Sequence, residues 1–84
     1  MTRISAMELC QKLKSEAIAK QDDSAVNNLR LRIIDYFIAH DLPDDIFEGA
    51  LKARLNDPDP AKEHSKVICA EILKAWQTRH DDRV

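Results

Sequence analysis

Apolar residues recur at intervals of three and four along most of the chain, which is the spacing of one face of an α-helix. In the first such stretch, Leu9 and Leu13 lie on the repeating apolar positions. A capping box precedes them, because Ser5 occupies the N-cap position and Glu8 follows three residues later. This pattern predicts a helix over about residues 6–20.

Short breaks rich in Asp, Asn, Ser and Pro divide the rest of the chain into three further periodic segments. The strongest break is residues 56–60, where Asp59 supplies an N-cap and Pro60 the first helical residue. The predicted helices cover residues 24–40, 43–55 and 60–79, with the segments 1–4 and 80–84 frayed. The fold class expected is all-α, a compact single-domain bundle of four helices over residues 1–84, in which the first two helices are antiparallel neighbours.

The helix predicted over residues 24–40 has an unusually wide apolar surface. Its apolar side chains span well over half of the helical circumference, whereas an ordinary surface helix needs an apolar stripe only somewhat wider than about 100°. We therefore expect this helix to be the most buried of the four, or to be shared between the core and a partner. Trp76 is also a candidate for a partner interface, because a large indole is hard to bury fully in a small protein. The candidate interface residues are Leu31, Ile34, Ile38 and Trp76.

Arg30 falls inside the same apolar arc and has two interpretations. In the first, its aliphatic stem packs against the core while its guanidinium reaches solvent. In the second, it forms a buried ion pair. We favour the first, because long basic side chains commonly cover apolar surface in this way.

The chain contains one glycine and three prolines, too few for a fold with many tight hairpin turns. Gly49 lies in the middle of the helix predicted over residues 43–55, where glycine costs up to about 1 kcal/mol relative to alanine. A close approach by another helix would justify that cost, and Ala50 and Ala53 would extend the same small face. We therefore expect Gly49→Leu to disturb packing or assembly, whereas Gly49→Ala is expected to be tolerated.

The net charge is −2, from 13 basic and 15 acidic residues, so the chain as a whole has no general affinity for nucleic acid or anionic membranes. In one segment, residues 33–51, every charged residue is acidic and there is no Lys or Arg. Its acids are Asp35, Asp41, Asp44, Asp45 and Glu48. Solvated helix starts explain these carboxylates most simply, and the functional alternative is a docking surface for a partner with a basic surface.

The second and third predicted helices also have the outline of a helix-turn-helix motif. In that motif the start of the second helix meets DNA bases and phosphates. Here that start carries Asp44 and Asp45, whose carboxylates would be repelled by phosphates. DNA binding is therefore kept only as the alternative.

The sequence contains no pattern typical of a catalytic, cofactor or metal site. Neither Cys10 nor Cys69 has a histidine on the same helical face, and one glycine cannot build a phosphate-binding loop. The paired Cys and His spacings of zinc sites are missing. The longest apolar run is far shorter than the about 20 residues of a membrane span. We therefore expect no enzyme activity, no cofactor, no metal and no membrane contact.

These observations favour a small non-enzymatic protein–protein interaction module. We expect a homodimeric adaptor, inhibitor or regulator that binds another protein in the cytoplasm, where the two cysteines would stay reduced. The alternative is a DNA-binding helix-turn-helix transcriptional regulator.

Overall fold

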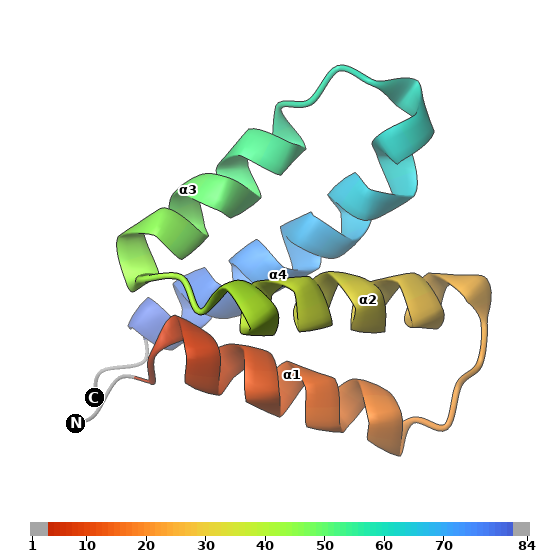
Figure 1. Cartoon of the computed structure of the whole chain (residues 1–84), viewed down its shortest axis with the longest axis horizontal. Helices are drawn as coiled ribbons and strands as arrows, with labels where there is room; N and C mark the ends of the chain where they lie inside the picture. Colours follow the sequence, from red (N-terminus) through yellow and green to blue (C-terminus); the bar gives the residue numbers. More distant parts are fainter. Residues whose placement is uncertain (1–3, 82–84) are drawn as a thin grey trace.

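The computed structural model describes residues 4–81, with side chains described for residues 4–78. The elements are α1 (Ala6–Ala19), α2 (Ala25–His40), α3 (Asp44–Leu55), the 3₁₀ turn η1 (Pro60–Lys62) and α4 (Glu63–Asp81) (Figure 1). Within residues 4–81 there is no strand, so the prediction of an all-α fold with four helices is confirmed. The expected fraying of 80–84 does not apply to residues 80 and 81, where α4 continues; residues 1–3 and 82–84 lie outside the described part of the chain.

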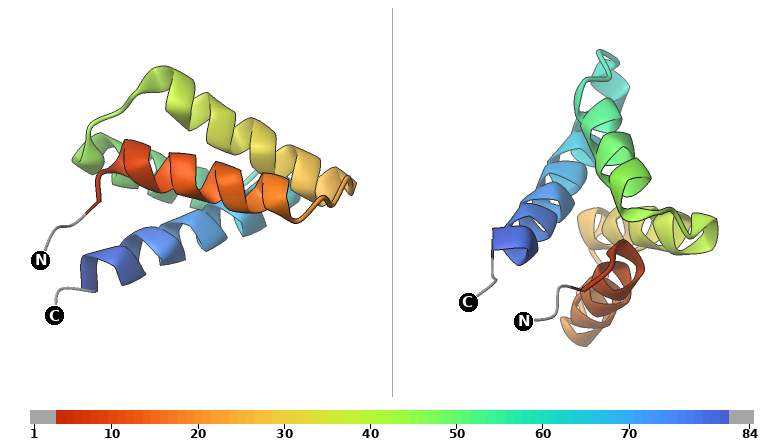
Figure 2. Two further views of the ribbon diagram at one scale, coloured as in Figure 1. Left: turned by 90° about the horizontal axis from the view of Figure 1, so that it is seen from below. Right: turned by 90° about the vertical axis from the view of Figure 1, so that its left-hand side faces the viewer.

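The four helices form two antiparallel pairs. α1 lies along α2, as predicted from their short connection, and α3 lies along α4 (Figures 1 and 2). The two pairs meet mainly where α2 contacts α4. The start of α4 and the end of α3 extend away from α2, so the second pair is covered by the first over only part of its length (Figure 1).

The helix starts follow short-range sequence signals. The Glu8 N–H donates to Ser5 Oγ at 3.2 Å, and Glu8 Oε1 accepts from the Ser5 N–H at 3.1 Å, which completes the predicted capping box. Ser24 is the N-cap of α2. Pro43 was expected at the first helical position of α3 but lies one residue earlier, at the N-cap, with an extended backbone.

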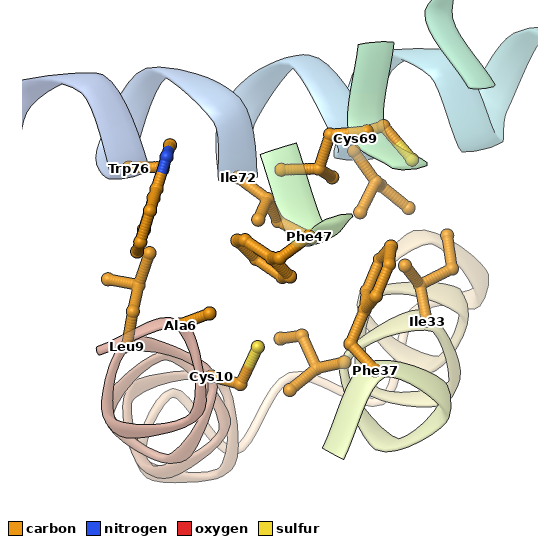
Figure 3. Close-up of a cluster of buried hydrophobic side chains, with 12 residues drawn as sticks. Ala6, Leu9, Cys10, Ile33, Phe37, Phe47, Cys69, Ile72 and Trp76 are labelled. Carbon is orange, nitrogen blue, oxygen red and sulfur yellow. The ribbon is translucent and has the colours of Figure 1, made fainter. Parts of the chain in front are cut away.

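A row of aromatic rings joins the two helix pairs (Figure 3). Phe37 of α2 meets Phe47 of α3 edge-on at 5.1 Å between ring centroids, and Phe47 meets Trp76 of α4 in the same way at 5.3 Å. Edge-to-face pairs at such distances stabilise a core beyond the area that they bury. Trp76 extends from α4 toward Leu9 of α1, so all four helices contribute to this core (Figure 3).

Two of the predicted interface residues belong to this core. Trp76 and Ile34 are each only 1% exposed. The indole is buried completely because its Nε1–H donates to Glu48 Oε1 at 2.8 Å, which satisfies its polar atom. The expectation that Trp76 is too large to bury was therefore wrong.

The expectation that the second helix is the most buried was also wrong. Among the described residues, α1, α2 and α4 contribute equally to the buried residues, with four from each helix. Val26 and Tyr36 of α2 remain 44% and 46% exposed. The apolar arc of α2 is wider than the surface that α1, α3 and α4 cover, and Tyr36 lies on the uncovered part.

Asn27 is the one fully buried polar residue in the described part of the chain, at 1% exposure. Its Nδ2 donates to the carbonyl oxygens of Ala17 at 3.2 Å and Asp22 at 2.8 Å, which closes the α1–α2 connection. Its Oδ1 accepts from Arg30 Nη1 at 2.8 Å.

Arg30 in turn reaches Glu71 of α4, with Nε–Oε2 at 3.1 Å and Nη2–Oε2 at 3.0 Å. The structure lies between the two interpretations of Arg30. The guanidinium forms an ion pair between helices, as in the second, but the pair lies at an exposed position with Glu71 51% exposed, as the first expects of the guanidinium.

Replacing Asn27 with alanine removes both bonds to the α1–α2 connection and leaves the Ala17 carbonyl without that donor. We expect the free energy of unfolding to fall by about 1–3 kcal/mol, the usual cost of unsatisfied buried polar groups. Asn28→Ala is the matched control, because the Asn28 Nδ2 also donates to a carbonyl, that of Asp23, but at an exposed position. In urea denaturation, the free energy of unfolding of the control should fall by less than about 0.5 kcal/mol. Equal losses of unfolding free energy in both variants would contradict the role given to Asn27.

Candidate functional site

A groove of about 430 Å³ lies between α2 and the α3–α4 pair. Tyr36 and His40, at the end of α2, form one wall. Ala50, Ala53 and Arg54 line it from α3. Its size lies within the range of small binding pockets. The helices that supply its lining, α2, α3 and α4, are labelled in Figure 1.

The wall from α2 is aromatic. The ring of Tyr36 packs on the ring of His40 at 4.1 Å between centroids, one helical turn further along. The carbonyl oxygen of Tyr36 lies 2.8 Å from His40 Nδ1. Because a carbonyl only accepts, Nδ1 carries the proton in this contact. Tyr36 also meets Phe37 edge-on at 5.7 Å, so it is the exposed end of the aromatic row that continues into the core.

Arg54 packs on this aromatic wall from the opposite side of the groove. Its guanidinium carbon lies 4.8 Å from the centroid of the Tyr36 ring and 5.4 Å from that of Phe37, which is cation–π geometry. The side chain is partly buried. The charge of Arg54 also acts on Cys69, where it lowers the thiol pKa against the larger, opposing effect of burial.

The floor of the groove is apolar and its far rim is charged. Leu42 and the two α3 alanines supply the floor. On the rim, Lys62 Nζ lies 3.4 Å from Asp57 Oδ2. The Asp59 N–H donates to Asp57 at 3.0 Å, and this bond is the main cause of a lowered pKa for the Asp57 carboxyl. The rim charges are therefore paired with each other.

None of the four residues predicted as an interface lines this groove. Trp76 and Ile34 are in the core, as described above, and are out of reach of a partner. Leu31 and Ile38 are half-buried, and Ile38 packs against the core.

Three of the five residues of the predicted acidic surface already have partners within the chain. Asp35 forms an ion pair with Lys14 at 2.8 Å. Asp44 Oδ1 accepts from the N–H of Ala6 at 2.9 Å and so ties the start of α3 to the start of α1. Glu48 accepts from Trp76 and pairs with Lys52 at 3.2 Å.

The remaining two acids of that segment are exposed. Asp41 ends α2 in the left-handed conformation, at φ 47°, and Asp45 lies in the first turn of α3. Of the five acids, three are thus engaged within the chain, and two are exposed and do not line the groove.

The small residues predicted to allow close helix packing, Gly49, Ala50 and Ala53, have other surroundings than expected. A Cβ added at Gly49 would meet no atom within 4 Å, and the residue is exposed. No helix of the described chain approaches it, so the expectation of close packing at Gly49 was wrong. Ala50 and Ala53 do matter, but as the floor of the groove, where their short side chains leave room.

Gly49→Ala should raise the free energy of unfolding by up to about 1 kcal/mol, because it restores helix propensity at an open helical site. Gly49→Leu should also leave the melting temperature unchanged or higher, contrary to the expectation from sequence. Ala53→Gly is the reciprocal control and should lower stability by a similar amount. A clear loss of stability in Gly49→Leu, measured by thermal melting, would show that something covers this face.

The described residues bring together no nucleophile–base pair around either cysteine. Cys10 and Cys69 are both buried free thiols, and burial raises the pKa of Cys10 to about 11. Within the described part of the chain, no three His, Cys, Asp or Glu side chains gather in a way that could hold a metal ion. None of the described helices combines the length and the apolar character needed to cross a membrane.

No family model, curated protein or solved structure matches this chain. The candidate site therefore rests on geometry alone. Sequence reasoning missed its two central residues, Tyr36 and Arg54. Tyr36 lies within the wide apolar arc of residues 24–40, so periodicity does not distinguish it from core residues, and no spacing in the sequence relates Arg54 to it. The one available signal was the pair Tyr36 and His40, which share a helical face at a spacing of four.

Proposed function

We propose that this chain is a non-enzymatic protein–protein interaction module that receives a segment of another protein in the groove between α2 and the α3–α4 pair. The observation that carries the proposal is the exposed Tyr36, which lies at the end of a buried aromatic row beside an apolar floor. Tyrosine and arginine are the residues that most often anchor protein interfaces, and this groove contains one of each.

The burial of both cysteines supports a non-enzymatic role. Because the thiolate is the reactive form, a thiol such as Cys10 with a pKa of about 11 is a poor nucleophile at neutral pH. An adaptor, inhibitor or regulator needs only a shaped surface, which the groove supplies. A cytoplasmic location, where these thiols would stay reduced, belongs to the same proposal.

We locate the proposed contact at the groove rather than at the acidic segment. Most of those carboxylates cap helices or pair within the chain, as described above, so a basic partner would have to displace them. DNA binding through a helix-turn-helix is disfavoured for a related reason. The first turn of α3 carries Asp44 and Asp45, and Asp44 already binds the N–H of Ala6.

A homodimer remains part of the proposal only in a revised form. Because Ile34 and Trp76 are core residues, a dimer would have to use other side chains, such as the exposed Ile46 of α3 or Val67 of α4. Sedimentation equilibrium over a wide concentration range tests this directly. A monomer at every concentration would remove the dimer and leave the groove proposal intact.

Filling the groove tests the main proposal. Ala53→Trp places a large side chain on an exposed helical position of the floor, and Ala70→Trp makes the same change at an exposed position of α4 outside the groove. We expect peptides selected from a random display library on the unmodified protein to bind Ala70→Trp normally. They should bind Ala53→Trp at least about tenfold more weakly, because a central interface contact contributes more than about 1 kcal/mol.

Thermal melting of both tryptophan variants shows whether each is folded. Failure to enrich any peptide would overturn the proposal, as would enriched peptides that bind Ala53→Trp unchanged. Strong, salt-dependent retention on DNA, lost on replacement of lysines, would favour the DNA-binding alternative instead.

A further inference from the structure

Arg54 differs from the other partly buried arginine of the described chain. Arg30 is paired with Glu71 through two guanidinium nitrogens. Arg54 instead lies over the rings of Tyr36 and Phe37, and it forms no hydrogen bond or ion pair to any carboxylate of residues 4–78. A half-buried cation without an acidic partner is costly to desolvate. An external carboxylate that pairs with it therefore gains more binding free energy than it would at the open surface.

The N–H groups of the Arg54 guanidinium form no bond to a carboxylate of residues 4–78, so they are open to an external acceptor. The guanidinium carbon lies near two rings that stand at 83° to each other. Contact with both rings restricts the side chain, which lowers the entropy lost when a ligand binds. Arg54 is therefore preorganised to accept a carboxylate through two parallel N–H···O bonds.

The other charges that line the groove do not compete for that carboxylate. Lys62 is already paired with Asp57 on the rim, so these two charges cancel. His40 uses Nδ1 in its contact with the Tyr36 carbonyl. The unbalanced charge of the groove is the single positive charge of Arg54, next to an apolar floor.

We propose that the groove binds an acidic peptide segment, in which an Asp or Glu carboxylate pairs with Arg54 and a neighbouring apolar side chain fills the floor beside Tyr36. This rests on the proposed function and names the chemistry of the partner. A peptide fits better than a nucleic acid, because the groove is lined by the carboxylate of Asp57 as well as by Arg54. A run of phosphates would meet the Asp57 carboxylate, whereas a single side-chain carboxylate needs to reach Arg54 alone.

The experiment is a double-mutant cycle on the peptides selected as described above. Each peptide is compared with its Glu→Gln or Asp→Asn counterpart, on the unmodified protein and on Arg54→Gln. We expect the selected peptides to share an acidic residue next to an apolar one. Neutralising that acid should weaken binding to the unmodified protein by about tenfold or more, since a charge-assisted hydrogen bond to a buried partner contributes at this level. The same change should have little effect on binding to Arg54→Gln.

Lys12→Gln is the matched control for loss of one positive charge, because Lys12 is exposed on α1, which contributes no residue to the groove. With this variant the acidic residue of the peptide should keep its full effect. Arg54→Lys, which keeps the charge but not the planar fork, should give an intermediate effect.

The outcomes separate the two proposals. Two outcomes would overturn the acidic-peptide proposal and leave the interaction module standing. In the first, peptides that bind Ala53→Trp more weakly contain no acidic residue. In the second, neutralising the acid of the peptide weakens binding to Arg54→Gln as much as binding to the unmodified protein. Absence of any groove-dependent peptide would overturn both. Preferential binding of single-stranded DNA over the acidic peptides would show that Arg54 recognises phosphate instead.

Discussion

The edge-on contacts of Phe37, Phe47 and Trp76 hold this fold together, because each ring comes from a different helix. They join the α1–α2 pair to the α3–α4 pair at the place where the two pairs meet. The indole N–H would be costly to bury unpaired, and Glu48 removes that cost. Tyr36 extends the same row to the surface, where it lines the candidate groove. The groove is therefore next to the aromatic contacts that stabilise the core.

A polar network supplements this apolar contact. Asn27 closes the α1–α2 connection, binds Arg30, and through it reaches Glu71 of α4. Such partly buried networks define geometry more than they add stability, because the cost of desolvating the charges offsets much of their attraction. The two contacts have complementary roles. The aromatic row supplies favourable burial, and the Asn27 network sets how the helices are oriented around it.

The distribution of paired and unpaired charges changes the functional picture. From the sequence, a docking surface for a basic partner was the functional alternative to solvated helix starts for the acids of segment 33–51. In the folded chain most of those acids are engaged in caps and ion pairs, whereas Arg54 is left without a carboxylate beside an apolar floor. This unpaired cation is the reason why the proposed partner is acidic rather than basic. Charge composition along the sequence did not indicate this, because it does not record which charges meet.

The sequence by itself determined the helices, their starts and the absence of strands from the described chain. These features depend on hydrogen bonds and apolar spacings within a few residues, as at Ser5 and Glu8, so a short window of sequence contains them. Only the tertiary structure decided which part of the wide arc of α2 is covered, that Trp76 is buried, that Gly49 faces open space, and that Arg54 meets Tyr36. These outcomes depend on which helix lies opposite each face. Helical periodicity gives the direction of a side chain around its own axis, but it does not give the position of the neighbouring helix that would cover it.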